Sequence, residues 1–230
     1  MVMGVAGIRS KPWSFIFVLH ETKAVSILNS LFNSKRAQAW RRFANTIGAT
    51  YQERSLLEKD RVCLSYKHWK IVMDKYEVGD GENNEVYTRL RTQYVSIDEF
   101  HFRIRSKSFV GRIAVFLGMS DINIEQPKFD RAFRVQSNDA LKVKEFLSDA
   151  HLRKLLYSPN AIGFSITDLA NTEKRVFLSE VAQLNYLQAK VVMDELELHR
   201  LFELMKLSLD RLVLLNIAYD ADPDSRTKNV

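Results

Sequence analysis

Cysteine, proline and glycine are all scarce in this sequence. A single cysteine, Cys63, among 230 residues excludes an internal disulfide framework, which is typical of proteins in a reducing compartment. Four prolines and eight glycines leave little material for long flexible linkers. Long apolar runs are missing too, since the longest, residues 13–19, is far shorter than the roughly 20 residues that cross a bilayer.

Acidic residues are almost absent from the N-terminal part. Up to Gln52 the chain has seven lysines and arginines against one acid, Glu21, whereas residues 53–230 carry 27 charges of each sign. This asymmetry predicts an anionic partner for the N-terminal part. Residues 1–45 lack the cleavage site of a secretory signal, but their basic composition also fits a mitochondrial transit peptide. We expect a cytoplasmic protein, either free or peripheral to a membrane.

Hydrophobic periodicity changes from helical to strand-like along the first half of the chain. Helical spacing covers residues 13–32, with a polar interruption at 20–23, and a second helix over 39–47 ends at Gly48. Strand-forming residues then dominate the segments 62–66, 69–76, 86–94, 100–107 and 129–135. Cys63 lies in the first of these, where we expect a buried thiol. Residues 110–117 fit either a short helix or a strand.

The second half of the chain shows clear helix-capping signals. Ser137-Asn138-Asp139 supplies the N-cap of a helical stretch that is either capped again or kinked at Ser148-Asp149 and stops before Pro159. Residues 161–166 and 174–178 predict a hairpin, and residues 184–192 are ambiguous. Asp194 and Glu197 form a capping box at the start of a long helix that we expect to reach about Ile217.

Together these segments predict an α+β fold in which antiparallel strands are flanked by helices. The order of helix followed by strands occurs twice, which is consistent with two related halves. We predict a basic, partly helical N-terminal segment over residues 1–34, a single α+β domain over 35–218, and a flexible tail over 219–230.

The central segment carries a recognisable motif. Gly118-Met119-Ser120-Asp121-Ile122-Asn123-Ile124 is followed by Phe129-Asp130-Arg131-Ala132-Phe133-Arg134-Val135 and by Ser137-Asn138-Asp139. This pattern, GMxDIxI…FDRxFxVxSND, resembles a group of bacterial proteins of unassigned activity, and the strand containing Trp69 and Asp74 belongs to the same pattern. The resemblance implies a bacterial origin and one folding unit over about residues 40–215.

Four arginines form the main candidate binding site. If residues 86–94 and 100–107 pair as a hairpin, one face carries the apolar residues and the other pairs Arg91 with Arg103 and Arg89 with Arg105, with Lys107 beyond. Like charges placed opposite each other are destabilising, so such a cluster favours a bound anion. The alternative is internal neutralisation, because Asp74 on the preceding strand can lie beside Arg89.

The aromatic residues of this hairpin argue against one class of ligand. Tyr94, Phe100 and Phe102 fall on the face opposite the arginines, whereas sheets that read RNA expose aromatic side chains among the basic ones. Nucleic-acid binding through the backbone phosphates remains the alternative to binding of an acidic protein.

Two further surfaces are candidates for contacts. Arg36, Arg41 and Arg42 provide a second basic patch, and the apolar residues near Arg9 and Lys11 are consistent with contact to an anionic membrane surface. The last helix is apolar almost all round, so it is either buried centrally or offers Leu201, Met205 and Leu212 to a partner or a second copy of the chain. We predict a protein contact there.

Signatures of catalysis and of metal binding are lacking. The sequence has no glycine-rich phosphate loop, no G-x-S-x-G turn and no metal-binding spacing of histidine or cysteine. We therefore expect no catalytic residues, no metal and no cofactor. The leading hypothesis is a non-catalytic interaction protein with an acidic partner or an anionic membrane surface; nucleic-acid binding is second and an enzyme of unrecognised type is third.

Overall fold

The computed structural model describes residues 13–53, 60–78, 84–108, 119–168 and 180–224, and side chains from residue 30 onward. The chain forms two compact units that divide between Gln38 and Ala39. The expectations for residues 1–12, 110–117 and 174–178 lie outside the described residues.

The N-terminal helix α1 is continuous over Trp13–Thr46. The prediction of a helical segment over residues 13–32, interrupted at 20–23, and of a second helix over 39–47 is therefore wrong, because one helix covers both. Polar residues do not end a helix, whereas glycine and proline do, and neither type occurs between residues 14 and 47. The helix ends as predicted at Gly48, whose φ of 67° lies in the left-handed region, while the amide of Ala49 donates to the carbonyl of Ala44 at 2.8 Å.

Nine antiparallel strands form one sheet in the order β1-β2-β3-β4-β9-β8-β5-β7-β6. The strands are β1 (Thr50–Gln52), β2 (Arg61–Tyr66), β3 (Trp69–Val78), β4 (Glu85–Val95), β5 (Phe102–Ser106), β6 (Ser120–Ile122), β7 (Phe133–Ser137), β8 (Ala161–Asp168) and β9 (Val181–Ala189). The helices after α1 are α2 (Pro127–Ala132), α3 (Ala140–Phe146), α4 (Ala150–Leu156) and α6 (Glu195–Leu214). The predicted α+β class is confirmed.

The predicted hairpin between residues 86–94 and 100–107 is wrong. β4 pairs with β3 on one side and β9 on the other, and β5 pairs with β8 and β7. The connecting residues 96–99 contain no glycine or asparagine to favour a tight turn. Instead, the amides of Ser96 and Ile97 donate to the carbonyls of Glu180 and Ile217, which holds this segment away from a hairpin geometry.

Two other segments differ from prediction. Residues 129–135 are not one strand, because Pro127 begins the short helix α2 and only Phe133 onward is extended. The ambiguous residues 184–192 supply most of strand β9, which pairs with β8.

The caps in the second half lie where the sequence indicates. Asp139 accepts hydrogen bonds from the amides of Leu141 and Lys142, and Asp149 accepts one from Leu152. Asp194 accepts one from the amide of Glu197 and begins α6. Since α3 and α4 are each only seven residues long, such caps satisfy a large share of their free amides.

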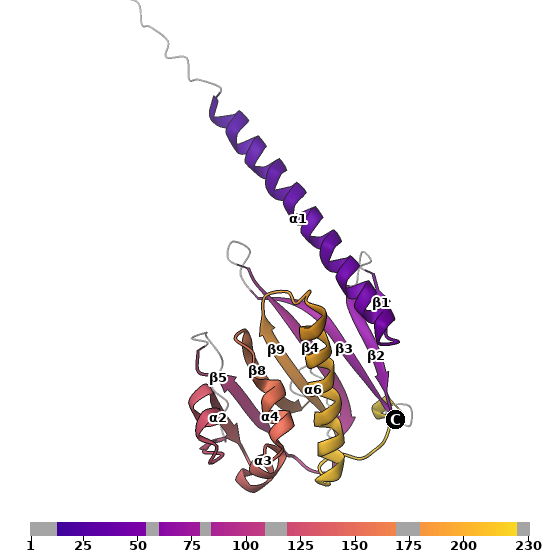
Figure 1. Ribbon diagram of the computed structural model, residues 1–230, viewed down its shortest axis with the longest axis vertical. Coiled ribbons are helices and arrows are strands. Elements are labelled where there is room, and N and C mark those ends of the chain that lie inside the picture. Colours follow the sequence, from indigo (N-terminus) through magenta and orange to yellow (C-terminus); the bar gives the residue numbers. More distant parts are fainter. Residues whose placement is uncertain (1–12, 54–59, 79–83, 109–118, 169–179, 225–230) are drawn as a thin grey trace, which may run out of the picture. The chain divides into compact units, whose positions relative to one another are not determined.

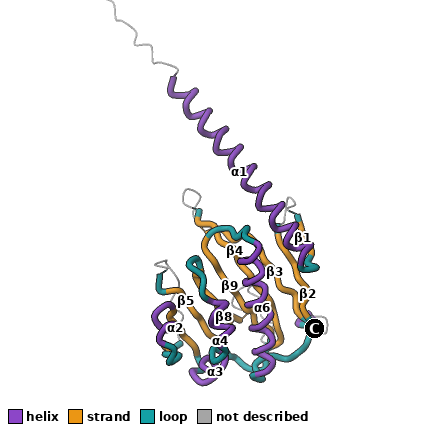
Figure 2. Tube along the Cα trace, viewed as in Figure 1, coloured by secondary structure: helices purple, strands orange, loops and turns teal. Residues whose placement is uncertain are grey.

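The hydrophobic core lies between one face of the sheet and the helices. Figures 1 and 2 show α4 and α6 lying across this face, and the last turns of α1, from Ala39 onward, contribute Trp40 and Phe43 to the core. Phe102 is fully buried and contacts Phe146 of α3 and Phe164 of β8, with ring centroids 5.1 and 5.3 Å apart. The residues that alternate with this apolar set point to the opposite face.

The prediction of a partner surface at Leu201, Met205 and Leu212 is wrong. All three side chains of α6 are fully buried in the chain's own core. Central burial explains why apolar residues occur almost all round this helix, because α6 packs on the sheet with α4 beside it. The exposed apolar residues of α6 are Leu196 and Leu214.

Candidate anion-binding face

The face of the sheet opposite α4 and α6, here called the polar face, carries arginines on four strands, β2, β4, β5 and β7. Cross-strand register aligns Asp74, Arg89, Leu187, Gly163 and Arg105 in one row. The adjacent row aligns Val72, Arg91, Asn185, Ser165 and Arg103. The four predicted arginines therefore share a face, but β9 and β8 lie between the two pairs, so their Cα atoms are about 14 Å apart across the sheet.

Asp74 neutralises part of this charge. Its carboxylate accepts two hydrogen bonds from Arg89, at 2.9 Å from Nε and 2.8 Å from Nη2, and lies 3.3 Å from Nη2 of Arg91. Asp74 is 7% exposed in its side chain, whereas Arg89 and Arg91 are 27% and 33% exposed. The alternative of internal neutralisation is thus confirmed for this half of the cluster, in which one carboxylate holds two guanidinium groups in place.

Arg103 and Arg105 lie in a different electrostatic environment. They are two positions apart on β5, which places both side chains on the polar face about 7 Å apart along the strand. Burial and, to a smaller extent, the nearby charge of Arg105 together lower the pKa of Arg103 to about 10. Arg105 donates from Nη2 to the amide oxygen of Gln136 at 3.2 Å. Arg103 is still protonated at neutral pH, and its lowered pKa shows that its positive charge is costly here.

A hollow of about 250 Å³ lies between the two pairs of arginines. Its lining consists of Tyr76, Arg89, Arg103, Arg105, Ile162, Gly163, Phe164, Ser165, Asn185, Tyr186 and Leu187. These residues include three arginines and no carboxylate, histidine or cysteine. The volume lies a little below the range of about 300–1,000 Å³ for sites that hold drug-sized molecules, so a small group fits best.

Gly163 explains why the sheet is hollowed at this point. It occupies the row between Leu187 and Arg105, where every other residue type would project a side chain. The pairing of β8 with β9 also shifts between Ala161 and Gly163, which is typical of a β-bulge. A methyl group added to Gly163 would approach only the carbonyl oxygen of Ile104, at an ordinary 3.5 Å. The backbone therefore leaves open space that the arginines border.

Tyr76 fixes one wall of the hollow. The guanidinium of Arg89 lies 4.6 Å from the centre of the Tyr76 ring, a cation–π contact, and the same guanidinium is held by Asp74. Two orienting contacts on one side chain reduce the conformational entropy that Arg89 would lose on binding a ligand. Leu187 and Ile162 add apolar surface to the lining.

The other predicted basic residues do not line this hollow. Lys107 donates from Nζ to the carbonyl of Asp130 at 2.6 Å, beside α2. Arg41 and Arg42 are exposed on α1, and Arg41 lies 3.3 Å from Glu53. Arg36 donates to the side chain of Asn33 at 3.0 Å, one turn earlier in the same helix.

A second hollow, of about 450 Å³, borders the other side of Arg91. It is lined by Arg61, Lys70 and Arg91 but also by Asp222 and Asp224, so its charges are mixed. Sequence reasoning missed this region, and it missed Gly163 and Asn185, because these residues come together only through the pairing of distant strands. Gly163 inside a strand-like run was the one available signal.

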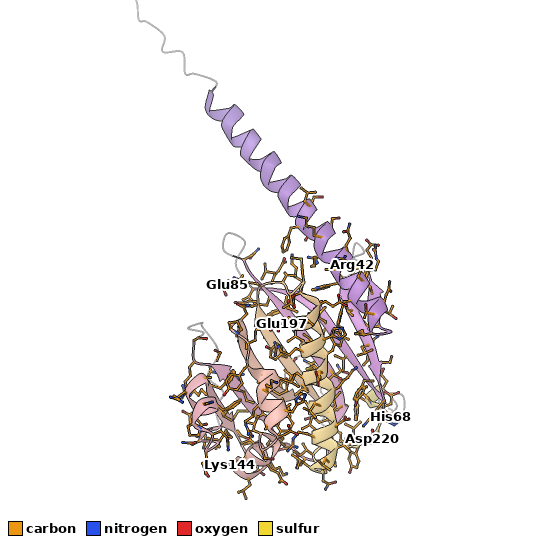
Figure 3. The ribbon with its side chains drawn as sticks, in the orientation of Figure 1. Arg42, His68, Glu85, Lys144, Glu197 and Asp220 are labelled. Atoms are coloured by element: carbon orange, nitrogen blue, oxygen red, sulfur yellow. The ribbon has the colours of Figure 1, made fainter. Side chains whose placement is uncertain are left out.

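The described part of the chain offers no cluster suited to a metal ion. Within those residues no three histidine, cysteine, aspartate or glutamate side chains are placed to hold a metal ion. His68 lies 3.9 Å from Asp220, and Figure 3 shows this pair near the C-terminal end of the described chain. Burial raises the pKa of the Cys63 thiol, which keeps it protonated and unreactive. Over the same residues, none of the helices has the length and apolarity to span a membrane.

Comparison with known proteins shows similarity of fold. No family model matches the sequence, and no curated protein matches it. Among solved structures, the chain is similar to the crystal structure of the mycobacterial trehalose monomycolate transport factor A, TtfA, with a TM-score of 0.52 and 11% identity. The similarity covers 80% of this chain and 98% of that chain. At this identity it establishes a shared fold alone.

Proposed function

We propose that this chain is a non-catalytic interaction protein that holds an acidic protein partner on the polar face of its sheet. The observation that carries the proposal is the gathering of Arg89, Arg103 and Arg105 around one hollow whose lining contains no carboxylate. Guanidinium groups bind carboxylates in bidentate geometry, and partly buried ones gain more from such pairing than exposed ones.

The composition of the two faces favours a protein partner over nucleic acid. On β4 and β5, Tyr94 and Phe102 are fully buried on the covered face, and Tyr87, which lies on the polar face beside Tyr76, is only 6% exposed, so none of the three is accessible to stack on bases. Tyr76 borders the hollow, but its ring is engaged by Arg89. Binding of acidic side chains requires the arginines but no accessible aromatic ring.

The fold comparison supports an interaction role without naming the partner. TtfA is named a transport factor, and a binding role for the present chain agrees with a transport-associated function. The resemblance of the central motif to a bacterial group supports a bacterial origin for the same proposal. The lining of the hollow offers no histidine, cysteine or carboxylate for acid–base or nucleophilic catalysis, which favours binding over an enzymatic role.

A binding experiment with three probes tests this proposal. We expect a fluorescent Glu-rich peptide to bind the full chain in low salt, and we expect the Arg103→Gln, Arg105→Gln double variant to weaken binding by about tenfold or more. Lys128→Gln with Arg131→Gln removes the same charge from α2, where both residues are exposed, and serves as the matched control. This control should bind the peptide as the wild type does.

The other two probes distinguish the alternatives. Preferential binding of a single-stranded oligonucleotide would replace the proposal with nucleic-acid binding. Flotation with phosphatidylglycerol vesicles, unaffected by the β5 variant, would move the function to a membrane surface elsewhere on the chain. Equal loss of peptide binding in the β5 and α2 variants would show that only total charge matters, which would refute a site on the polar face.

A further inference from the structure

The charge around the Gly163 hollow exceeds what a single carboxylate can balance. Asp74 and the four arginines of β4 and β5, which are Arg89, Arg91, Arg103 and Arg105, together carry a net charge of +3. Three of these arginines line the hollow directly. A carboxylate brings one negative charge, whereas a phosphate monoester carries about −1.5 to −2 near neutral pH and has three strong acceptor oxygens.

The number of hydrogen-bond donors also favours a phosphoryl group over a carboxylate. Arg89 lines the hollow from β4, and Arg103 and Arg105 line it from β5, while the guanidinium of Arg89 bonds Asp74 on β3 and that of Arg105 bonds Gln136 on β7. Each guanidinium has five N–H donors, so the donors that Asp74 and Gln136 leave over match the three acceptor oxygens of a phosphoryl group better than the two of a carboxylate. Ser165 and Asn185 lie between the two sides and add neutral hydrogen-bonding groups to the lining.

Gly163 sets how close such an anion can come to the sheet. Because this residue has no side chain, the phosphoryl group can rest on the backbone between Leu187 and Arg105. The neighbouring Leu187 and Ile162 offer apolar surface to the carbon atoms that carry the phosphate. A phosphorylated serine or threonine side chain has this combination, and so does a small free phosphomonoester.

We infer that the Gly163 hollow binds a phosphate monoester dianion between Arg89, Arg103 and Arg105. The inference rests on the proposed binding role of the polar face and makes it specific, because it names the group on the partner that is recognised. It also accounts for Asp74, which holds Arg89 and Arg91 in place without lining the hollow itself.

Titration of the full chain with simple anions tests the inference. We expect inorganic phosphate to bind at least about tenfold more tightly than acetate, since each lost charge-assisted hydrogen bond is worth roughly 1.5 kcal/mol or more. Inorganic phosphate should bind more weakly one pH unit below its own second pKa, where it is mostly a monoanion, than one unit above it, where it is mostly a dianion. Sulfate, a dianion at both pH values, controls for titration of the protein and should show no such change.

Three variants locate the site. Arg103→Gln with Arg105→Gln should abolish measurable phosphate binding, and the α2 control with Lys128→Gln and Arg131→Gln should leave it unchanged. Gly163→Ala keeps every charge, and its added methyl makes only an ordinary contact, so the variant should fold. Because the methyl occupies the hollow, we expect it to weaken phosphate binding severalfold.

Further titrations distinguish a phosphorylated protein from a free phosphomonoester as the ligand. They also distinguish failure of the phosphate specificity from failure of the proposed function. Tighter binding of a phosphoserine peptide than of glycerol phosphate would assign the site to a modified protein, and the reverse order would assign it to a free metabolite. Phosphate binding no tighter than that of acetate, or unaffected by Gly163→Ala, would overturn the inference. If the Glu-rich peptide still depends on Arg103 and Arg105 in that case, the proposed function stands and only the phosphate specificity fails.

Discussion

The two faces of the sheet are formed by the same strands but differ in composition and burial. On the covered face, Phe102, Ile104 and Phe164 are almost completely buried and contact helices. On the polar face, Arg103 and Arg105 alternate with them along β5, and Gly163 lies beside them on β8. The covered face stabilises the fold through apolar burial, whereas the polar face concentrates charge at a cost that an anion can offset. The comparison separates residues that hold the fold from residues available for binding.

The largest expected effect is on the covered face of β5. Phe102→Ala should lower the free energy of unfolding by about 3–5 kcal/mol, because it leaves a cavity among Phe100, Phe146 and Phe164. Urea unfolding followed by circular dichroism measures this change. Ser165→Ala, on the polar face of β8, is the control and should cost less than about 1 kcal/mol. Comparable losses in the two variants would contradict the division between the faces.

A polar cluster on the covered side should make stability depend on pH. The Arg200 guanidinium lowers the pKa of Glu197 through hydrogen bonds at 2.7 and 2.8 Å; burial opposes this, and a 2.8 Å bond from Gln188 adds to it. Glu197 lies near the start of α6 in Figure 3. We expect Glu197→Gln to cost about 3 kcal/mol at neutral pH, since it leaves Arg200 without its carboxylate.

The sign of the pH dependence follows from the lowered pKa. The stabilisation by Glu197 is fully present above its ordinary pKa of 4.5 and is lost as the pH falls through the lower value in the folded protein. Chemical unfolding at a series of acidic pH values should therefore show the wild type and Glu197→Gln converging below about pH 4. Parallel curves down to the lowest pH would show that Glu197 is not the responsible group.

Asp74 tests the charge balance of the polar face. Asp74→Ala removes two hydrogen bonds to Arg89 and the ion pair with Arg91, so we expect a loss of about 2 kcal/mol in unfolding free energy. Added sulfate should restore part of this loss by binding the released guanidinium groups. Restoration that is no greater than the effect of sulfate on the wild type would weaken the electrostatic account.

The smallest effect is expected at the edge of the sheet. Arg134 and Asp121 make a bidentate ion pair, with hydrogen bonds between 2.6 and 3.0 Å, but both side chains are more than half exposed. Arg134→Gln should leave the unfolding free energy almost unchanged, because solvent screens such pairs. Thermal unfolding in low and high salt measures the residual contribution, and a loss as large as that of Asp74→Ala would show that exposure does not predict the strength of this ion pair.

Sequence patterns predicted the local features of this fold and missed the non-local ones. The caps at Asp139, Asp149 and Asp194 and the end of α1 at Gly48 depend on residues within one turn, so they were correctly placed. Alternation along a strand is equally local, which is why Arg103 and Arg105 were assigned to the face opposite Phe102. The choice of neighbouring strands depends on the whole sheet, so the direct pairing of Arg89 with Arg105 was wrong.

The candidate site shows the same limit. Its arginines were named from the sequence, and the pairing of Arg89 with Asp74 was recognised as an alternative. The hollow itself arises because β8 and β9 enter between the arginine-bearing strands and bring Gly163 to the centre. No residue close to Arg103 in the sequence indicates that Gly163 lies beside it in the sheet. The sequence therefore predicts a cluster of positive charge at this site but not a cavity.

The most direct test of the binding role of the polar face is amide chemical-shift mapping during titration of the labelled full chain with the Glu-rich peptide. We expect the largest shifts at Arg103, Gly163, Ser165 and Asn185, which lie on three adjacent strands of that face. Residues of the covered face and of α2 should change little. Shifts confined to Arg41, Arg42 and their neighbours on α1, with none on β5 or β8, would contradict the account.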